Sequence, residues 1–337
     1  MQKKACIRII FLICIILLIT KTDLSIQGAK AGIEICLYSI IPSLFPFFFL
    51  SGCLSNTFTQ NNTPHASRLL TSLGIPQGAG SLCLLCAFCG YPVGAKVISE
   101  HYSNGTIEKD TAHRLLGFVN LTGPAFIFGI AAKLFSKIYT ALIIWLIQIV
   151  SAVIVALILP GTEQNTCHTS KRRALTATQI LENSIKNISL VCSWVIIFKI
   201  LLQYVNHYFS AILPQSLFTV LSGILEITNG CISLNLITTE AWRFILCNLF
   251  LSFGGICVWM QIFSVTQILG SGMFVYGKIL QTSVCGILTI IAQAFMYPGA
   301  ISTPAVIMFY LVCIIVISTF CYIINRKNSR KDNLTVV

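Results

Sequence analysis

Apolar segments of about 20 residues recur along this chain, and they constrain its fold more than any other feature. A helix of that length crosses the hydrocarbon core of a bilayer. Of the 337 residues, 56% are hydrophobic and only 9% are charged, whereas roughly a quarter of the residues of a soluble domain are charged. We therefore predict an all-α polytopic membrane protein whose principal partner is the lipid bilayer.

The net charge of +12 comes largely from three short basic clusters. Short loops rich in lysine and arginine stay on the cytoplasmic side of a membrane. We interpret the clusters as a topology signal and expect no nucleic-acid partner. Their members are Lys3, Lys4, Arg8, Lys171, Arg172, Arg173, Arg326, Lys327, Arg330 and Lys331.

The first segment, "IRIIFLICIILLIT", has a basic start and a short apolar core, as a signal peptide does. It is followed by "KTDLSIQGAK", which has no small-x-small cleavage pattern. We expect residues 1–29 to form an uncleaved signal-anchor helix.

The remaining chain divides into two halves of similar pattern. Each half has a long helix, a glycine-broken apolar segment, a helix interrupted by glycine or proline, and a plain apolar helix. Residues 86–94 correspond to 223–230, and residues 120–124 correspond to 251–255. We predict a first repeat at 30–159, a basic cytoplasmic linker at 160–179, a second repeat at 180–296, and a final span with a basic tail at 297–337.

The basic clusters select a topology for these segments. If residues 78–98 and 214–236 are re-entrant hairpins, each half crosses the membrane three times and the halves have opposite orientations. All three clusters and both termini then lie in the cytoplasm, as the positive-inside rule requires. The prediction is about eight transmembrane helices plus two re-entrant hairpins in an inverted-topology repeat.

Broken helices at membrane depth carry a functional implication. Irregular backbone is tolerated there only where protein or a water-filled cavity satisfies its polar groups. Four breaks in matched positions favour a site for a small polar solute or a coupling ion near the midplane. The alternative is that glycine and proline only allow close packing of helices.

Glu226 is the sharpest candidate for such a site. It lies in "SGILEITNGCISL", between apolar residues, and an intramembrane carboxylate usually faces a cavity or a partner. Asn229 is one helical turn along on the same face, and Gly230 follows it. Alternatively, Glu226 lies in water at a hairpin tip or helix end.

The corresponding segment of the first half is "CGYPVGAKV". Tyr91 and Pro92 are expected to form its turn, with Gly94 allowing close backbone approach. Lys96 either extends its charged end to the interface or pairs with Glu226 or an anion.

The two interrupted helices supply further candidates. In "NLTGP", Pro124 frees backbone carbonyls that Asn120 and Thr122 can satisfy, unless these side chains face a ligand. "SFGG" is the counterpart and contains Gly254 and Gly255, with Gln261 on the same helix. Hydrogen bonding between helices would explain these amides equally well.

No catalytic constellation is visible, so we do not expect an enzyme, a cofactor or a metal. The histidines lack metal-ligand spacing, and no phosphate-binding or nucleophile motif occurs. Cys83, Cys86 and Cys89 have a helical spacing but no obvious histidine or aspartate partner.

Five segments together resemble a known family. "IIPSLFPFFFLSG", "GYPVGAK", "FVNLTGPAFIFG", "SGILEITNG" and "LSFGGICVWMQIFSV" are similar to segments of the YlbJ-type sporulation integral membrane proteins of endospore-forming Firmicutes. That family carries the nucleoside-recognition (gate) domain, which also occurs in concentrative nucleoside transporters. The resemblance covers about residues 30–296 and implies a role in spore formation, with residues 90–96 and 226–230 as gate elements.

Two functions follow as hypotheses. The first is a transporter-like sporulation protein of the cell membrane that moves or binds a small polar solute, nucleoside-like or otherwise, between two inverted repeats. The second is a non-transporting membrane scaffold for assembly of the spore envelope or cortex.

Overall fold

The computed structural model describes residues 2–57, 75, 79–159 and 175–301, together with residues 304, 307, 308 and 311. Every regular element in these residues is helical. The predicted span at 301–324 and the basic clusters at 171–173 and 326–331 lie almost entirely outside the described residues.

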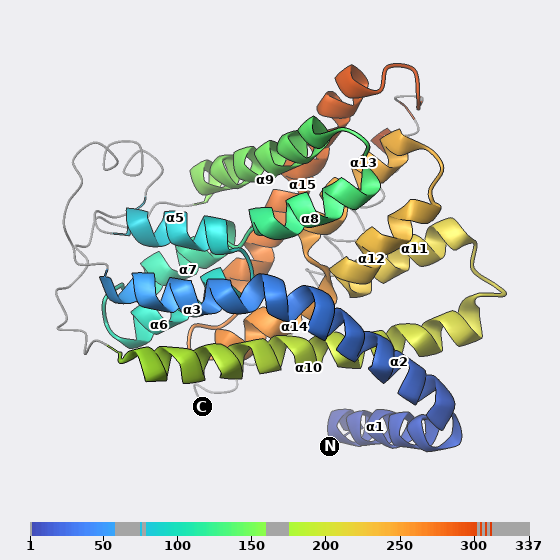
Figure 1. Ribbon diagram of the computed structural model, residues 1–337, viewed down its shortest axis with the longest axis horizontal. Coiled ribbons are helices and arrows are strands. Elements are labelled where there is room, and N and C mark those ends of the chain that lie inside the picture. Colours follow the sequence, from blue (N-terminus) through green and yellow to red (C-terminus); the bar gives the residue numbers. More distant parts are fainter. Residues whose placement is uncertain are drawn as a thin grey trace.

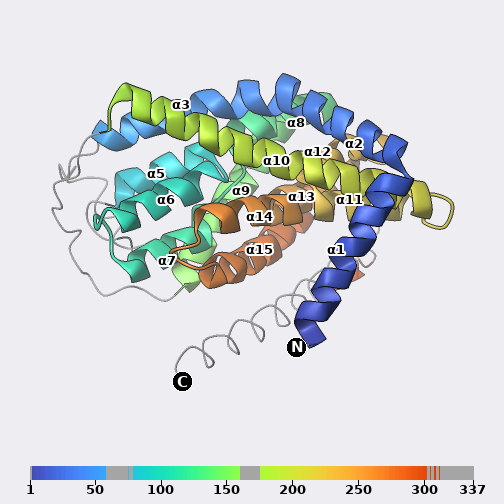
Figure 2. The ribbon, with the colours of Figure 1, turned by 90° about the horizontal axis from the view of Figure 1, so that it is seen from below.

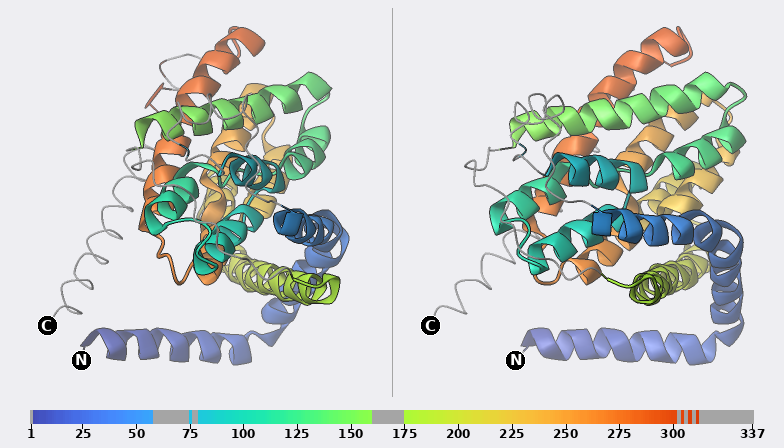
Figure 3. Two further views of the ribbon diagram at one scale, coloured as in Figure 1. Left: turned by 90° about the vertical axis from the view of Figure 1, so that its left-hand side faces the viewer. Right: turned by 60° about the vertical axis from the view of Figure 1, so that its left-hand side comes forward.

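The first half contains a long N-terminal region, a hairpin, a broken helix and a straight helix (Figure 1). Its elements are α1 (Gln2–Thr20), α2 (Thr22–Ile35), the π-helix η1 (Cys36–Ile40), α3 (Ile41–Thr57), α5 (Gly80–Cys89), α6 (Val93–Ser103), α7 (Lys109–Phe118), α8 (Pro124–Leu134) and α9 (Ile138–Ile158). Helix α1 stands off the bundle and is joined to it through α2 (Figure 3).

The second half has a long helix, a hairpin, a broken helix and a straight helix in the same order. Its elements are α10 (Ala177–Phe209), α11 (Gln215–Leu225), α12 (Ile227–Ser233), the 3-10 helix η2 (Leu234–Leu236), α13 (Glu240–Phe253), α14 (Gly255–Val265) and α15 (Gly272–Met296).

Five stretches of the described residues are long and apolar enough to cross a membrane. They are Thr22–Leu54, Ile138–Ile158, Ala177–Phe209, Glu240–Val265 and Gly272–Met296. The protein is thus a helical membrane protein, as predicted. The interrupted helix expected in the first half is two short helices, α7 and α8, because Pro124 and the residues before it interrupt the helical hydrogen bonds.

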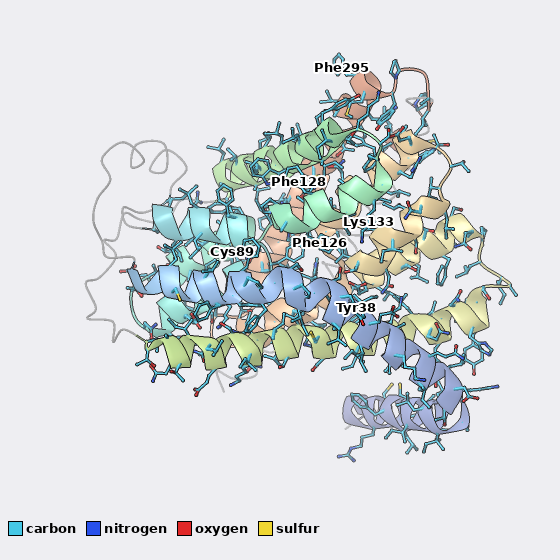
Figure 4. All side chains as sticks on the ribbon, viewed as in Figure 1. Tyr38, Cys89, Phe126, Phe128, Lys133 and Phe295 are labelled. Carbon is cyan, nitrogen blue, oxygen red and sulfur yellow. The ribbon has the colours of Figure 1, made fainter. Side chains whose placement is uncertain are left out.

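Large apolar side chains cover the outer surface of the bundle. Phe295 is 83% exposed and Tyr38 is 81% exposed, and both project outward in Figure 4. Water would strongly disfavour such a surface, whereas lipid tails match it. The core lies around Glu240–Val265, where 89% of the most apolar window is enclosed by other helices.

Helix α10 packs along α2 and α3 (Figure 2), and two glycines of α2 make this contact close. A Cβ atom on Gly28 would lie 2.7 Å from the Cα of Ile200, and one on Gly32 would lie 2.9 Å from the Cα of Ile196. Glycines four residues apart let two membrane helices approach to backbone contact.

Prolines and serines shape the start of α3. Pro46 lies inside this helix and the π-helix η1 precedes it. The Ser43 hydroxyl donates to the Ser39 carbonyl at 2.6 Å, so it gives this carbonyl a side-chain donor close to the prolines.

Two arginines, Arg114, which is buried, and Arg243, which is partly buried, cap the ends of other helices. Arg114 of α7 donates to the carbonyls of Leu159 and Ala156 at the end of α9, at 2.6 and 2.7 Å. Arg243 of α13 donates to the Leu134 carbonyl at the end of α8, at 2.9 Å. A cation at a helix C-terminus satisfies carbonyls that have no partner within the helix and complements the helix dipole.

Candidate functional site

Helices α5 and α6 form a hairpin whose tip is residues 90–92, which we name tip 1. Gly90 has φ +73°, and a Cβ atom there would lie 2.4 Å from the backbone nitrogen of Gly123. Only glycine permits both this conformation and this approach. The Tyr91 amide donates to the Leu121 carbonyl at 2.9 Å, so tip 1 is held by backbone against the break between α7 and α8.

Helices α11 and α12 form the second hairpin, and its tip is Glu226, which we name tip 2. Glu226 has an extended backbone and only 1% of its surface is exposed. Its carboxylate accepts hydrogen bonds from the Thr228 amide at 3.0 Å, the Asn229 amide at 2.8 Å and the Asn229 side-chain Nδ2 at 2.7 Å. The carboxylate therefore caps α12 and lies inside the protein, at a hairpin tip but not in water.

The arms of the second hairpin are in backbone contact. A Cβ atom on Gly230 would lie 2.2 Å from the Cα of Gly223. The hairpin can close so tightly only because both positions are glycine.

The break between α7 and α8 covers residues 119–123. Asn120 Nδ2 donates to the Leu116 carbonyl at 2.9 Å, and the Thr122 hydroxyl donates to the Leu251 carbonyl at 2.7 Å. Asn120 thus satisfies a carbonyl beside the break that Pro124 creates, as expected, whereas the carbonyl that Thr122 satisfies is not one that Pro124 frees. That carbonyl lies across the molecule, at the other broken helix.

The break between α13 and α14 lies at Gly254 and Gly255, with φ +83° and +75°. A Cβ atom on Gly255 would lie 3.1 Å from the backbone nitrogen of Ile227, and one on Gly254 would lie 3.6 Å from the ring of Tyr91. The second break therefore touches both hairpin tips.

A hydrogen-bonded junction joins three of these features, tip 1 and the two breaks, and tip 2 packs against the second break. The Tyr91 and Thr122 hydroxyls are 2.7 Å apart, and the Tyr91 hydroxyl lies 3.4 Å from the Leu251 carbonyl. In Figure 1 the hairpin α5–α6 lies on the left and α11–α12 on the right, with both tips directed toward the middle of the bundle.

A small cavity of about 70 Å³ lies at this junction. That volume holds several water molecules, because one water needs about 10–15 Å³ on this measure. The lining includes polar groups from both hairpins, both broken helices, η1 and α3. They are Tyr91, Thr122, Glu226, Thr228, Gln261, Ser39 and Ser43. The rest of the lining is mostly apolar.

The twelve residues singled out in the sequence fall into two groups. Five line the cavity: Tyr91, Pro92, Thr122, Glu226 and Gln261. The others are outside its lining: Gly94, Lys96, Asn120, Asn229, Gly230, Gly254 and Gly255.

Within the second group, the roles differ. Asn229 holds the Glu226 carboxylate, and Gly254 and Gly255 shape the second break. Gly94 approaches Cys86 and Asn120. Lys96 forms an ion pair with Glu100, one turn along α6, at 3.1 Å.

Two lysines near the site were missed in the sequence. Lys199 of α10 donates to Asn229 Oδ1, so a cation is connected to Glu226 through one amide. Lys278 of α15 is 2% exposed and lies beside Tyr91. Lys278 is the one lysine of α15, and Lys199 stands between apolar residues in the second half of α10, where an intramembrane charge is itself a signal of function.

No cluster of three or more histidine, cysteine or acidic side chains that could hold a metal occurs in the part of the chain that the structure describes. The chemical character of the cavity comes from the hydrogen bonds around one carboxylate. A carboxylate can bind a hydrogen-bond donor, a proton or a cation.

Tyr91→Phe tests the junction. The change removes the hydroxyl that meets Thr122 and leaves the ring in place, so we expect a loss of about 1 kcal/mol in the free energy of unfolding. Thermal unfolding of the purified protein in detergent measures it. Tyr139→Phe, at a ring that is 47% exposed, is the matched control and is expected to have little effect. If Tyr91→Phe were as stable as the wild type, the hydrogen bond between Tyr91 and Thr122 would not stabilise the fold, which would contradict the junction.

Comparisons with known proteins give one relative. The chain is 29% identical over 126 residues to the sporulation integral membrane protein YlbJ of Bacillus subtilis (strain 168), which is 36% of this chain and 30% of the relative. The match thus spans less than a third of the relative's length. No family model matches the chain, and no solved structure matches it. This protein is therefore a helical membrane protein that is similar, over about a third of its length, to an integral membrane protein of sporulation.

Proposed function

We propose that this protein is a transporter-like membrane protein of sporulation that binds and moves a small polar solute at the cavity between the two hairpin tips. One observation carries the proposal: two hairpin tips and two helix breaks meet around a cavity that contains a buried carboxylate. Backbone breaks at membrane depth are costly, and proteins use them where a solute or ion must be bound.

The order of elements supports an inverted repeat as the basis of this site. In each half a long helix, a hairpin, a broken helix and a straight helix follow one another. The hairpins extend toward each other from opposite ends of the bundle (Figure 1). Alternating access would then be a movement of the tips relative to the long helices α2, α3 and α10. In this topology both termini are cytoplasmic.

The size of the cavity limits the solute in this conformation. Pockets for drug-sized ligands usually measure about 300–1,000 Å³, and the cavity here measures about 70 Å³. A nucleoside-like solute would require tips 1 and 2 to separate. The arrangement is that of a closed state.

The role in sporulation rests on the similarity to the B. subtilis protein and on the five resembling segments. That the protein is not an enzyme stays a prediction from the sequence.

One observation favours a second function. Three N–H groups already bond the Glu226 carboxylate, so it can serve as a structural cap alone. In that case the protein is a membrane scaffold for assembly of the spore envelope that retains hairpins without transport.

Uptake by proteoliposomes separates the two functions. The full chain is reconstituted and tested with a panel of nucleosides, amino acids and small organic acids. Protein-dependent accumulation of at least one solute is expected for a transporter. No uptake of any solute, together with normal spore formation by a host strain that carries Glu226→Gln, would contradict transport and support the scaffold.

A further inference from the structure

Lys278 is a buried cationic residue with no assigned role. It lies on α15 with 2% of its surface exposed. No aspartate or glutamate within 4.0 Å pairs with it in the described part of the chain. Intramembrane lysines of this kind usually pair with an acid or take part in ion or proton movement.

Its neighbours are two oxygens and one aromatic ring. Nζ lies 2.8 Å from Gln281 Oε1 and 3.2 Å from the Ser252 carbonyl, and 5.2 Å from the centre of the Tyr91 ring. A neutral amine has two N–H groups, which match the two oxygens. An ammonium has a third N–H, for which only the aromatic face is at hand.

These neighbours belong to the moving parts of the proposed site. Tyr91 is tip 1, and Ser252 lies two residues before the second break. Lys278 therefore lies between the tip of one repeat and the break of the other. Any separation of tip 1 from this break would expose Nζ to the cavity.

The free energy of burying an ammonium opposes what its neighbours contribute. Taking an ammonium out of water without a counter-charge costs more than one cation–π contact and two hydrogen bonds return. Docking of tip 1 thus leaves the third N–H of an ammonium without an oxygen partner, whereas a separated, hydrated tip 1 would supply water to it.

The other ionisable groups do not supply a counter-charge. Tyr91 and Cys285 are uncharged neighbours at neutral pH. From α7, His113 contacts the Leu269 carbonyl and the Arg114 guanidinium contacts the end of α9. From α13, Asn248 and Ser252 face α15 through uncharged groups.

A buried polar face leads along α15 toward its C-terminal end. The members of this face are each at most 4% exposed, and they are Lys278, Gln281, Thr282, Cys285, Thr289 and Gln293. Across from it, Gln148 of α9 donates to the Asn248 carbonyl at 3.2 Å. A row of buried polar side chains inside a membrane protein is typical of a route for ions or protons, and this row leads to Lys278.

We propose that Lys278 is a proton-binding site and that binding of the proton releases tip 1 from the second break. Its use in transport rests on the proposed function. The coupling between protonation of Lys278 and release of tip 1 needs no solute, so it is tested separately from transport.

Hydrogen exchange measured by mass spectrometry tests this coupling. The full chain in lipid nanodiscs is compared between pH 6 and pH 9, with rates corrected for intrinsic chemistry. In wild type we expect protection of residues 85–95 to fall as the pH is lowered. One proton can change the opening equilibrium by at most about tenfold per pH unit.

Two variants locate the proton. Lys278→Met and Lys278→Gln cannot be protonated, so both are expected to keep residues 85–95 protected at every pH. Lys186→Met, at an exposed lysine of α10, is the matched control and is expected to keep the wild-type pH step. If protection of residues 85–95 in the wild type does not change with pH, the proposal is overturned even if both variants fail to fold. It is also overturned if either variant keeps the pH-dependent change in protection.

Discussion

Glu226→Gln is expected to lower the initial rate of solute uptake by about tenfold or more. The amide keeps the size of the side chain but turns one acceptor oxygen into a donor. That donor would oppose the N–H groups of Thr228 and Asn229, and leaving a buried donor unsatisfied costs about 1–3 kcal/mol. The change also removes the one carboxylate that the described residues contribute to the lining of the cavity.

The measurement is uptake of a transported solute by proteoliposomes, together with thermal stability of the same preparations. Glu182→Gln, at an exposed glutamate of α10, is the control and is expected to transport like wild type. Uptake by Glu226→Gln at the wild-type rate would remove this carboxylate from the binding site.

Gly277→Ala is expected to lower the free energy of unfolding by about 3 kcal/mol or more, the upper range for overpacking of a well-filled interior. A Cβ atom on Gly277 of α15 would lie 1.8 Å from the Gly117 carbonyl oxygen of α7. Backbone cannot yield as a flexible side chain does, so the two helices must separate. Gly117 and Gly277 therefore hold the first broken helix against α15.

Gly129→Ala is the matched control, because no atom lies within 4 Å of a Cβ built at that helical glycine. Alanine in a helix interior is favoured over glycine by roughly 0.5–1 kcal/mol, so this change is expected to have the opposite sign. Thermal unfolding in detergent compares the two variants. Similar stability of both would show that the contact between α7 and α15 is looser than described here.

The sequence was informative about where the helices break. Glycine and proline at residues 90–94 and 123–124 predict the first tip and the first break, since few other residues adopt or tolerate these conformations. Glu226 with Asn229 three residues on predicts a helical contact, and Asn229 does donate to the Glu226 carboxylate. These features depend on local sequence, which is why they could be predicted.

The meeting of the breaks could not be read from local patterns. Tyr91, Thr122 and Leu251 are joined over separations of 31 to 160 residues, and only the packing of the helices brings them together. The partner of Lys96 could not be predicted either. Glu100 lies one helical turn away and competes with every distant partner for the lysine.

Lys199 and Lys278 could have been found but were not. Each stands alone in an apolar span, "WVIIFKILLQY" or "GMFVYGKILQT", where a charge is costly and therefore informative. Their partners, Asn229 and Ser252, required the fold. Lys199 joins α10 to tip 2, and Lys278 joins α15 to the second break.

Chemical labelling of cysteines tests most directly whether the two tips share one water-filled cavity. Cys89 and a Thr228→Cys substitution both lie at the lining, from opposite hairpins, whereas Cys86 and Cys285 are fully buried elsewhere. Mass spectrometry of the full chain in nanodiscs, after treatment with a small charged thiol reagent, gives the rate at each position. We expect Cys89 and the cysteine at position 228 to react, each more slowly when a transported solute is present, while Cys86 and Cys285 stay unlabelled. Reaction of neither lining cysteine, or labelling of Cys86 as fast as Cys89, would contradict a shared aqueous site between the tips.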